Sequence, residues 1–238
     1  AEVGKDRQKR INRATFTREI SAACGRSFSP PCVSVAEDKC RIQMCQRPSF
    51  EVSRGFAQYS AGNGAFCGDS TNVFYDGCGR LVAILSDGMG TGGRAAVDGA
   101  MTAAMAESLL KAGIGFDSML QTVNSALIAK SGDESLATMD IACIDLFSGK
   151  AEFRKAGAAG SVVRRGRRTE LIEASSMPVG IMPSVEFAVT ERELTAGDVV
   201  VLVSDGVVAS GTEWLVDFVA NCDEEENPNT LAERITEE

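Results

Sequence analysis

Short apolar runs separated by turn residues dominate the chain from residue 50 onward, and this pattern predicts a strand-rich fold. Segment 50–60, FEVSRGFAQYS, is the first candidate strand. Segment 71–88 contains two apolar runs around Asp76–Gly77, a residue pair typical of the turn in a β-hairpin. Further strands are predicted in the segments 138–146, 151–157, 160–166, 169–174, 185–194 and 197–206.

Two helices are predicted between these groups of strands. In segment 94–111 the apolar residues fall roughly on one helical face, and segment 117–130 keeps the i, i+3, i+4, i+7 spacing, with Asp117 as a cap. A last helix is predicted around 213–220, followed by a helical turn at the end of the sequence. Strands on both sides of a central helix pair favour a layered α+β domain over alternating βαβ units.

The first 48 residues have a different character. Segment 5–25 predicts a basic, weakly amphipathic helix ended by Gly25, and the prolines in segment 29–49 predict a linker. We therefore divide the chain into an N-terminal helix and linker, residues 1–48, and one domain, residues 49–238.

Composition narrows the classes of function. The chain has 238 residues and a net charge of −9, which argues against a nucleic-acid partner held by bulk electrostatics. No apolar run approaches the ~18 residues of a membrane span, and the first residues do not resemble a signal peptide. The eight cysteines include no C-x-x-C pair, so we interpret them as reduced thiols of a cytoplasmic protein. The chain has no histidine, which excludes Ser-His-Asp and Cys-His catalysis.

The segment LSDGMGTG, residues 85–92, allows three interpretations. Gly88, Gly90 and Gly93 satisfy G-x-G-x-x-G, but no βαβ unit surrounds them and the expected acidic residue falls on Glu107, inside a predicted helix. A Walker-type loop lacks its lysine, because Arg94 stands there. The third interpretation is a flexible connection. An isolated glycine pattern of this kind is weak evidence for nucleotide binding.

A second Ser-Asp-Gly sequence gives a stronger signal. LVAILSDG and VVVLVSDG both lead an apolar strand into an aspartate and a glycine, at Asp87–Gly88 and Asp205–Gly206. Asp69 stands in a similar context just before the predicted hairpin. Each aspartate alone is typical of a turn or cap. Three of them at strand ends, in a chain without histidine, favour a site for a hard divalent cation such as Mg²⁺ or Mn²⁺.

These residues resemble those of a known family. GDS at 68–70, LSDGMG at 85–90, ATMD at 137–140, SSMPVGI at 175–181 and LTAGDVVVLVSDGV at 194–207 occur in this order in the metal-dependent Ser/Thr protein phosphatases, the PPM family. The resemblance is closest to the stage II sporulation protein E branch and covers about residues 50–215. It implies a β-sandwich of two antiparallel sheets flanked by helix pairs.

The resemblance also implies a mechanism and its catalytic residues. Asp87 would bridge two Mn²⁺ or Mg²⁺ ions, the Gly88 carbonyl and Asp69 would serve one of them, and Asp205 would serve the other. Two such metal ions would lower the pKa of a water molecule that they share, so that it can attack a phosphoserine. The implied substrate is a phosphorylated anti-anti-sigma factor, whose dephosphorylation leads to activation of a sigma factor in sporulation.

Three further expectations follow from the resemblance. The helix pair over 94–130 would mediate regulation and homodimerisation, and residues 1–48 would be a regulatory-type segment joined to an upstream, membrane-tethered region that this chain lacks. The domain over 49–238 lacks the closing strand on which the family carries a further metal-binding aspartate. We therefore expect one bound ion or none in this chain.

Two other classes of function stay open at this point. A catalytically silent phosphatase fold could act as a regulatory binding module, and a nucleotide-binding protein would respond to nucleotide rather than to Mn²⁺.

Overall fold

The computed structural model describes residues 2–4, 12–36, 39–59, 66–90, 92–130, 135–223 and 226–238. The chain forms two compact units, residues 1–51 and 52–238. Each is described separately.

The first unit combines one helix with a small antiparallel sheet. Helix α2 (Arg13–Cys24) begins at Asn12, whose side chain accepts hydrogen bonds from the first turn, and it ends at Gly25, which adopts a left-handed conformation as expected. Strands β1 (Glu2–Gly4), β3 (Lys39–Gln43) and β2 (Cys32–Ala36) pair in that order. The predicted helix over residues 5–11 lies outside the described residues.

The linker predicted over 29–49 is wrong. Residues 32–36 and 39–43 form an antiparallel hairpin instead, with Val33 opposite Ile42 and Val35 opposite Cys40. The prolines at 30, 31 and 48 stand outside the two strands, so they bound the hairpin and do not interrupt it.

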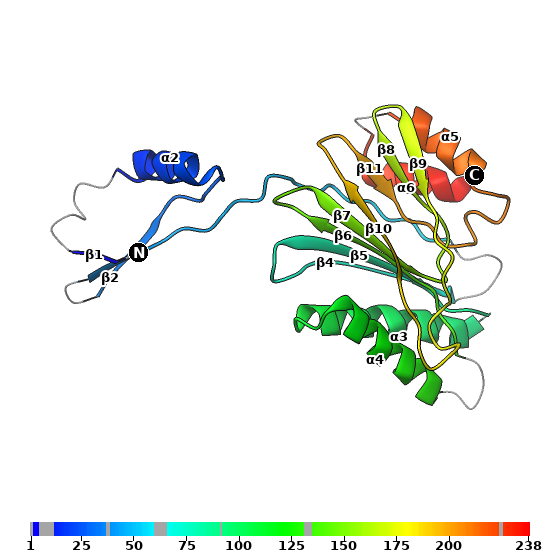
Figure 1. Ribbon diagram of the computed structural model, residues 1–238. Coiled ribbons are helices and arrows are strands. Elements are labelled where there is room, and N and C mark those ends of the chain that lie inside the picture. The colour runs from blue at the N-terminus through cyan, green and yellow to red at the C-terminus, as the bar shows by residue number, and fades with distance from the viewer. Residues whose placement is uncertain are drawn as a thin grey trace. The chain divides into compact units, whose positions relative to one another are not determined.

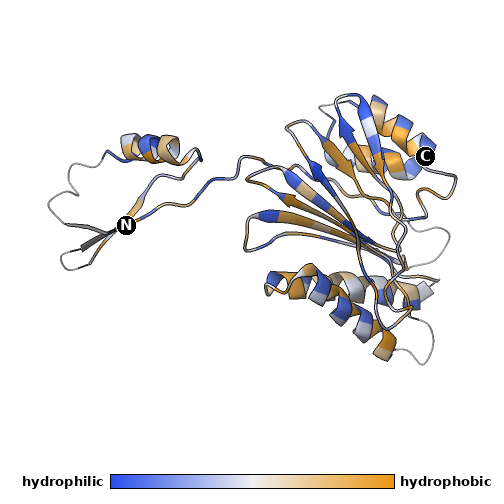
Figure 2. Ribbon diagram, viewed as in Figure 1, coloured by the Kyte–Doolittle hydropathy of each residue, from blue (hydrophilic) through white to orange (hydrophobic). Residues whose placement is uncertain are grey.

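A five-stranded antiparallel sheet forms the centre of the second unit. Its order is β10 (Ala188–Glu193), β7 (Lys150–Ala156), β6 (Met139–Asp145), β5 (Arg80–Asp87) and β4 (Asp69–Tyr75). The hairpin predicted around Asp76–Gly77 joins β4 to β5, as expected. The central strands β5 and β6 are strongly hydrophobic (Figure 2), because both faces of this sheet are covered.

The strand predicted over 50–60 is also wrong. Residues 51–59 have no regular structure, and residue 60 lies outside the described residues. Single hydrogen bonds hold this segment instead: the Phe56 amide donates to the Asn229 side chain, and the Gln58 side-chain amide donates to the Asp69 carbonyl.

A second antiparallel sheet and two layers of helices complete the unit. The sheet has the order β11 (Val199–Val201), β8 (Ser161–Arg165) and β9 (Arg168–Ile172). Helices α3 (Gly92–Lys111) and α4 (Phe116–Lys130) cover the five-stranded sheet, whereas α5 (Glu213–Asn221) and α6 (Pro228–Glu237) lie beside the three-stranded sheet (Figure 1).

Each helix layer has its own hydrophobic core. Met119, Val123 and Leu127 of α4 are buried with residues of β5 and β6, and Leu215, Val219 and Leu231 are buried with Val162 of β8. The expected α+β architecture, two antiparallel sheets flanked by helix pairs, is confirmed. Among the described helices, none combines the length and hydrophobicity that crossing a membrane requires.

Candidate metal centre

Two of the predicted site residues meet at the open end of the β4–β5 hairpin. Asp69, the first residue of β4, is the register partner of Asp87, the last residue of β5. The Asp76 side chain fixes this register at the closed end, where its Oδ1 accepts hydrogen bonds from the amides of Cys78 and Arg80, both at 2.9 Å. A tight turn at one end of the hairpin therefore places two carboxylates face to face at the other.

Backbone packing against helix α3 explains why glycine follows Asp87. A Cβ atom on Gly88 would lie 1.9 Å from the Ala95 carbonyl oxygen, and one on Gly99 would lie 2.1 Å from the Gly68 carbonyl oxygen. The Gly88 amide also donates to the Gly68 carbonyl at 3.1 Å. Only glycine permits so close an approach of two backbones. The glycines at 68, 88 and 99 thus seat the helix directly against the carboxylate-bearing strand ends.

Thr138, just before β6, holds the backbone of Asp87 from the other side. The Thr138 amide donates to the Asp87 carbonyl at 2.8 Å, and the Asp87 amide donates to the Thr138 hydroxyl at 3.1 Å. The neighbouring Ser86 hydroxyl donates to the Thr138 carbonyl at 2.8 Å. Both backbone groups of Asp87 are satisfied in this way, which leaves its carboxylate as the group that faces the site.

The second Ser-Asp-Gly sequence reaches the same place from the other sheet. Beyond β11 the chain turns at Ser204, and the Ser204 hydroxyl donates to Asp69 Oδ2 at 3.0 Å. Asp205, the next residue, is exposed and begins a series of turns in which its carbonyl accepts from the Val208 amide. The second Ser-Asp-Gly sequence thus lies next to Asp69, and the Asp205 carboxylate is near enough to interact with that of Asp87.

The pKa of Asp87 is raised by its burial and by the two nearby carboxylates. Burial raises its pKa, and the charges of Asp69 and Asp205, together with hydrogen bonds to both carboxyls, raise it further to about 7. An ordinary aspartate titrates near 3.9. Three carboxylates so close together repel one another unless a cation or a proton lies among them.

The donor groups fit a hard divalent cation. Asp87 Oδ1 and the Gly88 carbonyl oxygen lie 2.8 and 2.9 Å from the point that a Cβ atom on Gly68 would occupy, so both oxygens lie close to the same side of Gly68, where only a residue without a side chain fits. Carboxylate and carbonyl oxygens are the ligands that Mg²⁺ and Mn²⁺ prefer. Within the described ranges, no group of three or more His, Cys, Asp or Glu side chains is placed so that it could hold a metal ion by itself. The fit therefore rests on the type of donor atom and on the charge.

Sequence reasoning missed two supporting residues and one buried cluster. Ser204 and Thr138 are the direct partners of Asp69 and Asp87, and the paired Ser-Asp-Gly sequences were the only signal that pointed toward Ser204. Asp140 does not join the site, because its carboxylate pairs with buried Lys155. Arg54 lines a separate groove with Phe56 and Asn229.

Comparisons with known proteins point to one family. The family model of Stage II sporulation protein E (SpoIIE) matches residues 77–238. Stage II sporulation protein E from Bacillus subtilis (strain 168) is 35% identical over 159 residues, which are 67% of this chain and 19% of that protein. The same protein from Priestia megaterium is 31% identical over 176 residues, 74% of this chain and 30% of that protein. The chain therefore spans less than a third of either curated relative.

A solved structure shares the fold. The PP2C phosphatase domain and a fragment of the regulatory domain of the cell fate determinant SpoIIE from Bacillus subtilis match with a TM-score of 0.78 and 26% identity, covering 93% of this chain and 68% of that chain. The two sheets and flanking helices described above thus form the fold of PP2C phosphatase domains.

Proposed function

Because this chain belongs to the SpoIIE family and contains a PP2C-type serine phosphatase domain, we propose that it hydrolyses phosphoserine in a protein substrate with the help of Mn²⁺ or Mg²⁺. The observation that carries this proposal is the convergence of Asp69, Asp87 and Asp205 beside the Gly88 carbonyl. An anionic pocket of this kind repels a phosphate ester by itself, so the reaction requires a cation there.

Each residue has a defined part in the proposed site. Asp69, Asp87 and the Gly88 carbonyl would hold one ion, and Asp205 would share a second ion with Asp87 where a second ion binds. Bound divalent ions supply charge neutralisation for the phosphoryl group and a more acidic water. Thr138 keeps the Asp87 backbone fixed, and Ser204 orients Asp69 through its hydroxyl. These 238 residues include no histidine, so they supply no imidazole to protonate the leaving serine oxygen.

For the substrate, we propose a phosphorylated anti-anti-sigma factor, and for the biological role, regulation of a sigma factor in sporulation. Family membership supports both. The described cysteines are all free, which suits a reducing compartment, and we propose that the domain works on the cytoplasmic side of a membrane-tethered protein.

Turnover of p-nitrophenyl phosphate and of a phosphoserine protein, each with Mn²⁺ and with excess chelator, tests the proposal. We expect activity only with metal, and nearly complete loss in Asp87→Asn, because that residue serves both ions. Activity that persists in the variant or in chelator would overturn the assignment. Mn²⁺ binding without any turnover would favour a silent binding module, and stabilisation by a nucleotide instead of Mn²⁺ would favour a nucleotide-binding protein.

A further inference from the structure

A buried polar cluster lies between the two sheets of the second unit. Asp140 of β6 and Lys155 of β7 are register partners, and the Lys155 ammonium donates to Asp140 Oδ2 at 2.6 Å. The same ammonium donates to the Ser161 hydroxyl of β8 at 2.7 Å and to the Ala159 carbonyl at 2.6 Å. Ser161 in turn donates to Asp140 Oδ2 at 2.7 Å. One lysine therefore joins two strands of one sheet to the first residue of a strand in the other.

Complete burial makes this cluster unusual. Asp140 and Lys155 are each 1% exposed, and Ser161 is 0% exposed. Burial raises the pKa of Asp140 and lowers that of Lys155, in each case against the attraction of the partner. The second carboxylate oxygen, Asp140 Oδ1, is buried and accepts no hydrogen bond among the described residues. Burying ionic groups costs free energy, and an apolar pair of similar volume is often as stable, so the cluster invites a functional explanation.

The cluster adjoins the backbone that carries Asp87. Asp140 is the register partner of Leu85 on β5, two residues before Asp87. Thr138, two residues before Asp140 on the same segment, makes both hydrogen bonds to the Asp87 backbone. A shift of β6 would therefore move Thr138 and, with it, the Asp87 carboxylate.

On its other side the cluster adjoins the backbone that leads to Asp205. Ser161 precedes Val162, which is the register partner of Val201, the last residue of β11. The chain then runs through Ser204 to Asp205. A shift of β8 against β6 would change the separation of Asp205 from Asp87, since Asp87 ends a strand of one sheet and Asp205 follows a strand of the other.

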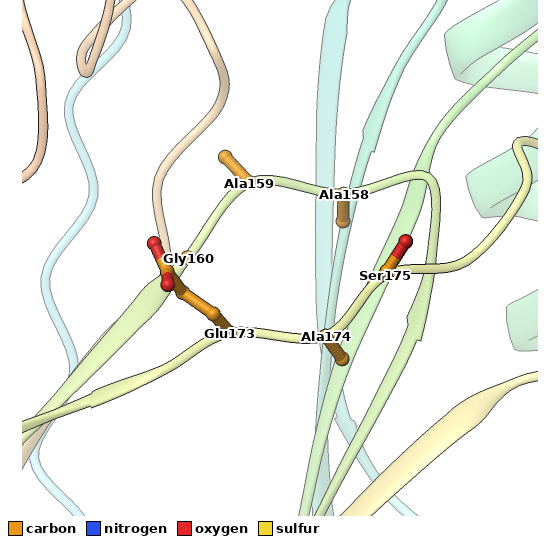
Figure 3. A pocket seen from close by; sticks show the side chains of 6 residues that line it. All are labelled: Ala158, Ala159, Gly160, Glu173, Ala174 and Ser175. Atoms are coloured by element: carbon orange, nitrogen blue, oxygen red, sulfur yellow. The ribbon is translucent and has the colours of Figure 1, made fainter.

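The hydrogen bond from Lys155 to the Ala159 carbonyl also links the cluster to the loop that leads into β8. Residues 158–160 lie opposite residues 173–175, and the two segments border an open pocket of about 400 Å³ (Figure 3). The Lys155 hydrogen bond to Ala159 fixes the start of β8 from inside this loop.

We propose that Lys155 is a positioning residue for the metal site: by binding Asp140, Ser161 and the Ala159 carbonyl together, it sets the spacing between Asp87 on one sheet and Asp205 on the other. This inference rests on the proposed function. A neutral side chain of the same length at position 155 would fill the space but would make no hydrogen bonds to Asp140, Ser161 and the Ala159 carbonyl.

The test compares the wild-type full protein with the double variant Asp140→Asn/Lys155→Met, which removes both buried charges and keeps their approximate shape. Such replacements commonly leave a protein folded. Mn²⁺ binding is measured by calorimetry and by electron paramagnetic resonance, well below the unfolding temperature. We expect affinity about tenfold weaker, in the range found for residues that support metal ligands, an altered resonance spectrum, and a lower kcat with little change in KM.

Arg165→Met is the matched control. Arg165, at the other end of β8, pairs with Asp198 just before β11, so it links the same strands away from the site. Its loss should leave Mn²⁺ affinity and kcat unchanged. If the double variant does not fold, Ser161→Ala takes its place, with a smaller loss of affinity expected because the ion pair remains.

The outcomes separate the two proposals. Folded variants with wild-type Mn²⁺ affinity and spectrum would overturn the role of Lys155 and leave the proposed function intact. A wild-type protein that binds no Mn²⁺ would overturn both. An equal loss of Mn²⁺ affinity in Arg165→Met would show that any contact between β8 and β11 affects the metal site. This result too would overturn the specific role of Lys155.

Discussion

Asp69 and Asp87 face each other as the last register pair of the β4–β5 hairpin, two like charges directly across a ladder. Like charges in this position destabilise a sheet. We therefore expect Asp87→Asn to stabilise the metal-free protein by up to about 1 kcal/mol, even though it removes activity. Thermal unfolding in excess chelator measures the effect, and Asp217→Asn, at an exposed position of α5, is the control. A metal-free Asp87→Asn variant less stable than wild type would contradict this account.

Close backbone packing predicts a sharp difference among glycines. Gly88→Ala and Gly99→Ala place a Cβ atom within 2.1 Å of a carbonyl oxygen, so helix α3 must move away from the site. We expect losses of about 1–3 kcal/mol or more in unfolding free energy. Gly93→Ala, in the first turn of the same helix, meets nothing nearer than 4.0 Å and should be neutral or slightly stabilising. Urea denaturation compares the three variants, and equal effects would refute the packing argument.

Ser204 offers a milder perturbation of the proposed metal site. Ser204→Ala removes the hydroxyl that donates to Asp69 Oδ2 and keeps every carboxylate. We expect Mn²⁺ affinity to fall about tenfold, as for other residues that orient metal ligands, with the fold unchanged. Calorimetric titration measures the affinity. The exposed Ser210, in the same series of turns, provides the control variant Ser210→Ala, which should bind Mn²⁺ as wild type does.

The contribution of Asp76, at the closed end of the β4–β5 hairpin, to the free energy of unfolding should depend on pH. Burial alone would raise the pKa of Asp76, but hydrogen bonds from Arg80 and Cys78 outweigh burial and lower it. A lowered folded-state pKa stabilises the protein above the unfolded value, near 3.9, and this contribution is lost as pH falls through the folded value. Asp76→Ala should therefore lower the free energy of unfolding most at neutral pH and progressively less below pH ~4. Urea unfolding across this range checks the prediction, and a loss of stability that stays constant with pH would contradict it.

Two arginines near one turn should behave differently. Arg164 is 1% exposed and donates to the Cys222 carbonyl at 2.7 Å, whereas Arg167 lies exposed in the β8–β9 turn. Arg164→Ala should cost about 2–5 kcal/mol through a cavity and an unsatisfied carbonyl, and Arg167→Ala should cost almost nothing. Thermal unfolding distinguishes them, and comparable losses would contradict the assigned role of Arg164.

Local patterns were sufficient for much of this fold. The Asp76–Gly77 turn, the spacing of α4 and the continuous apolar runs of β5 and β6 are properties of neighbouring residues, so the sequence alone predicts those elements. The three aspartates could be found for the same reason, because each follows or precedes an apolar strand and stands next to glycine.

Other features depend on contacts between distant segments. Residues 51–59 have the composition of a strand, yet they pair with no strand among the described residues, and single hydrogen bonds to the Asn229 side chain and the Asp69 carbonyl hold them. The 32–36 and 39–43 hairpin has proline on both sides, which suggested a linker. Lys155 and Asp140 look like outward residues of alternating strands until the second sheet covers them. No local pattern contains this information.

The hydrogen bond from Ser204 to Asp69 joins positions 135 residues apart, which has a consequence for biosynthesis. At roughly 5–20 residues per second, a ribosome adds the second position roughly 7–27 s after the first. During that interval the nascent chain carries Asp69 and Asp87 but not the turn that brings Asp205 to them. A metal centre that includes Asp205 therefore cannot be complete until the turn after β11 has been synthesised and has reached Asp69.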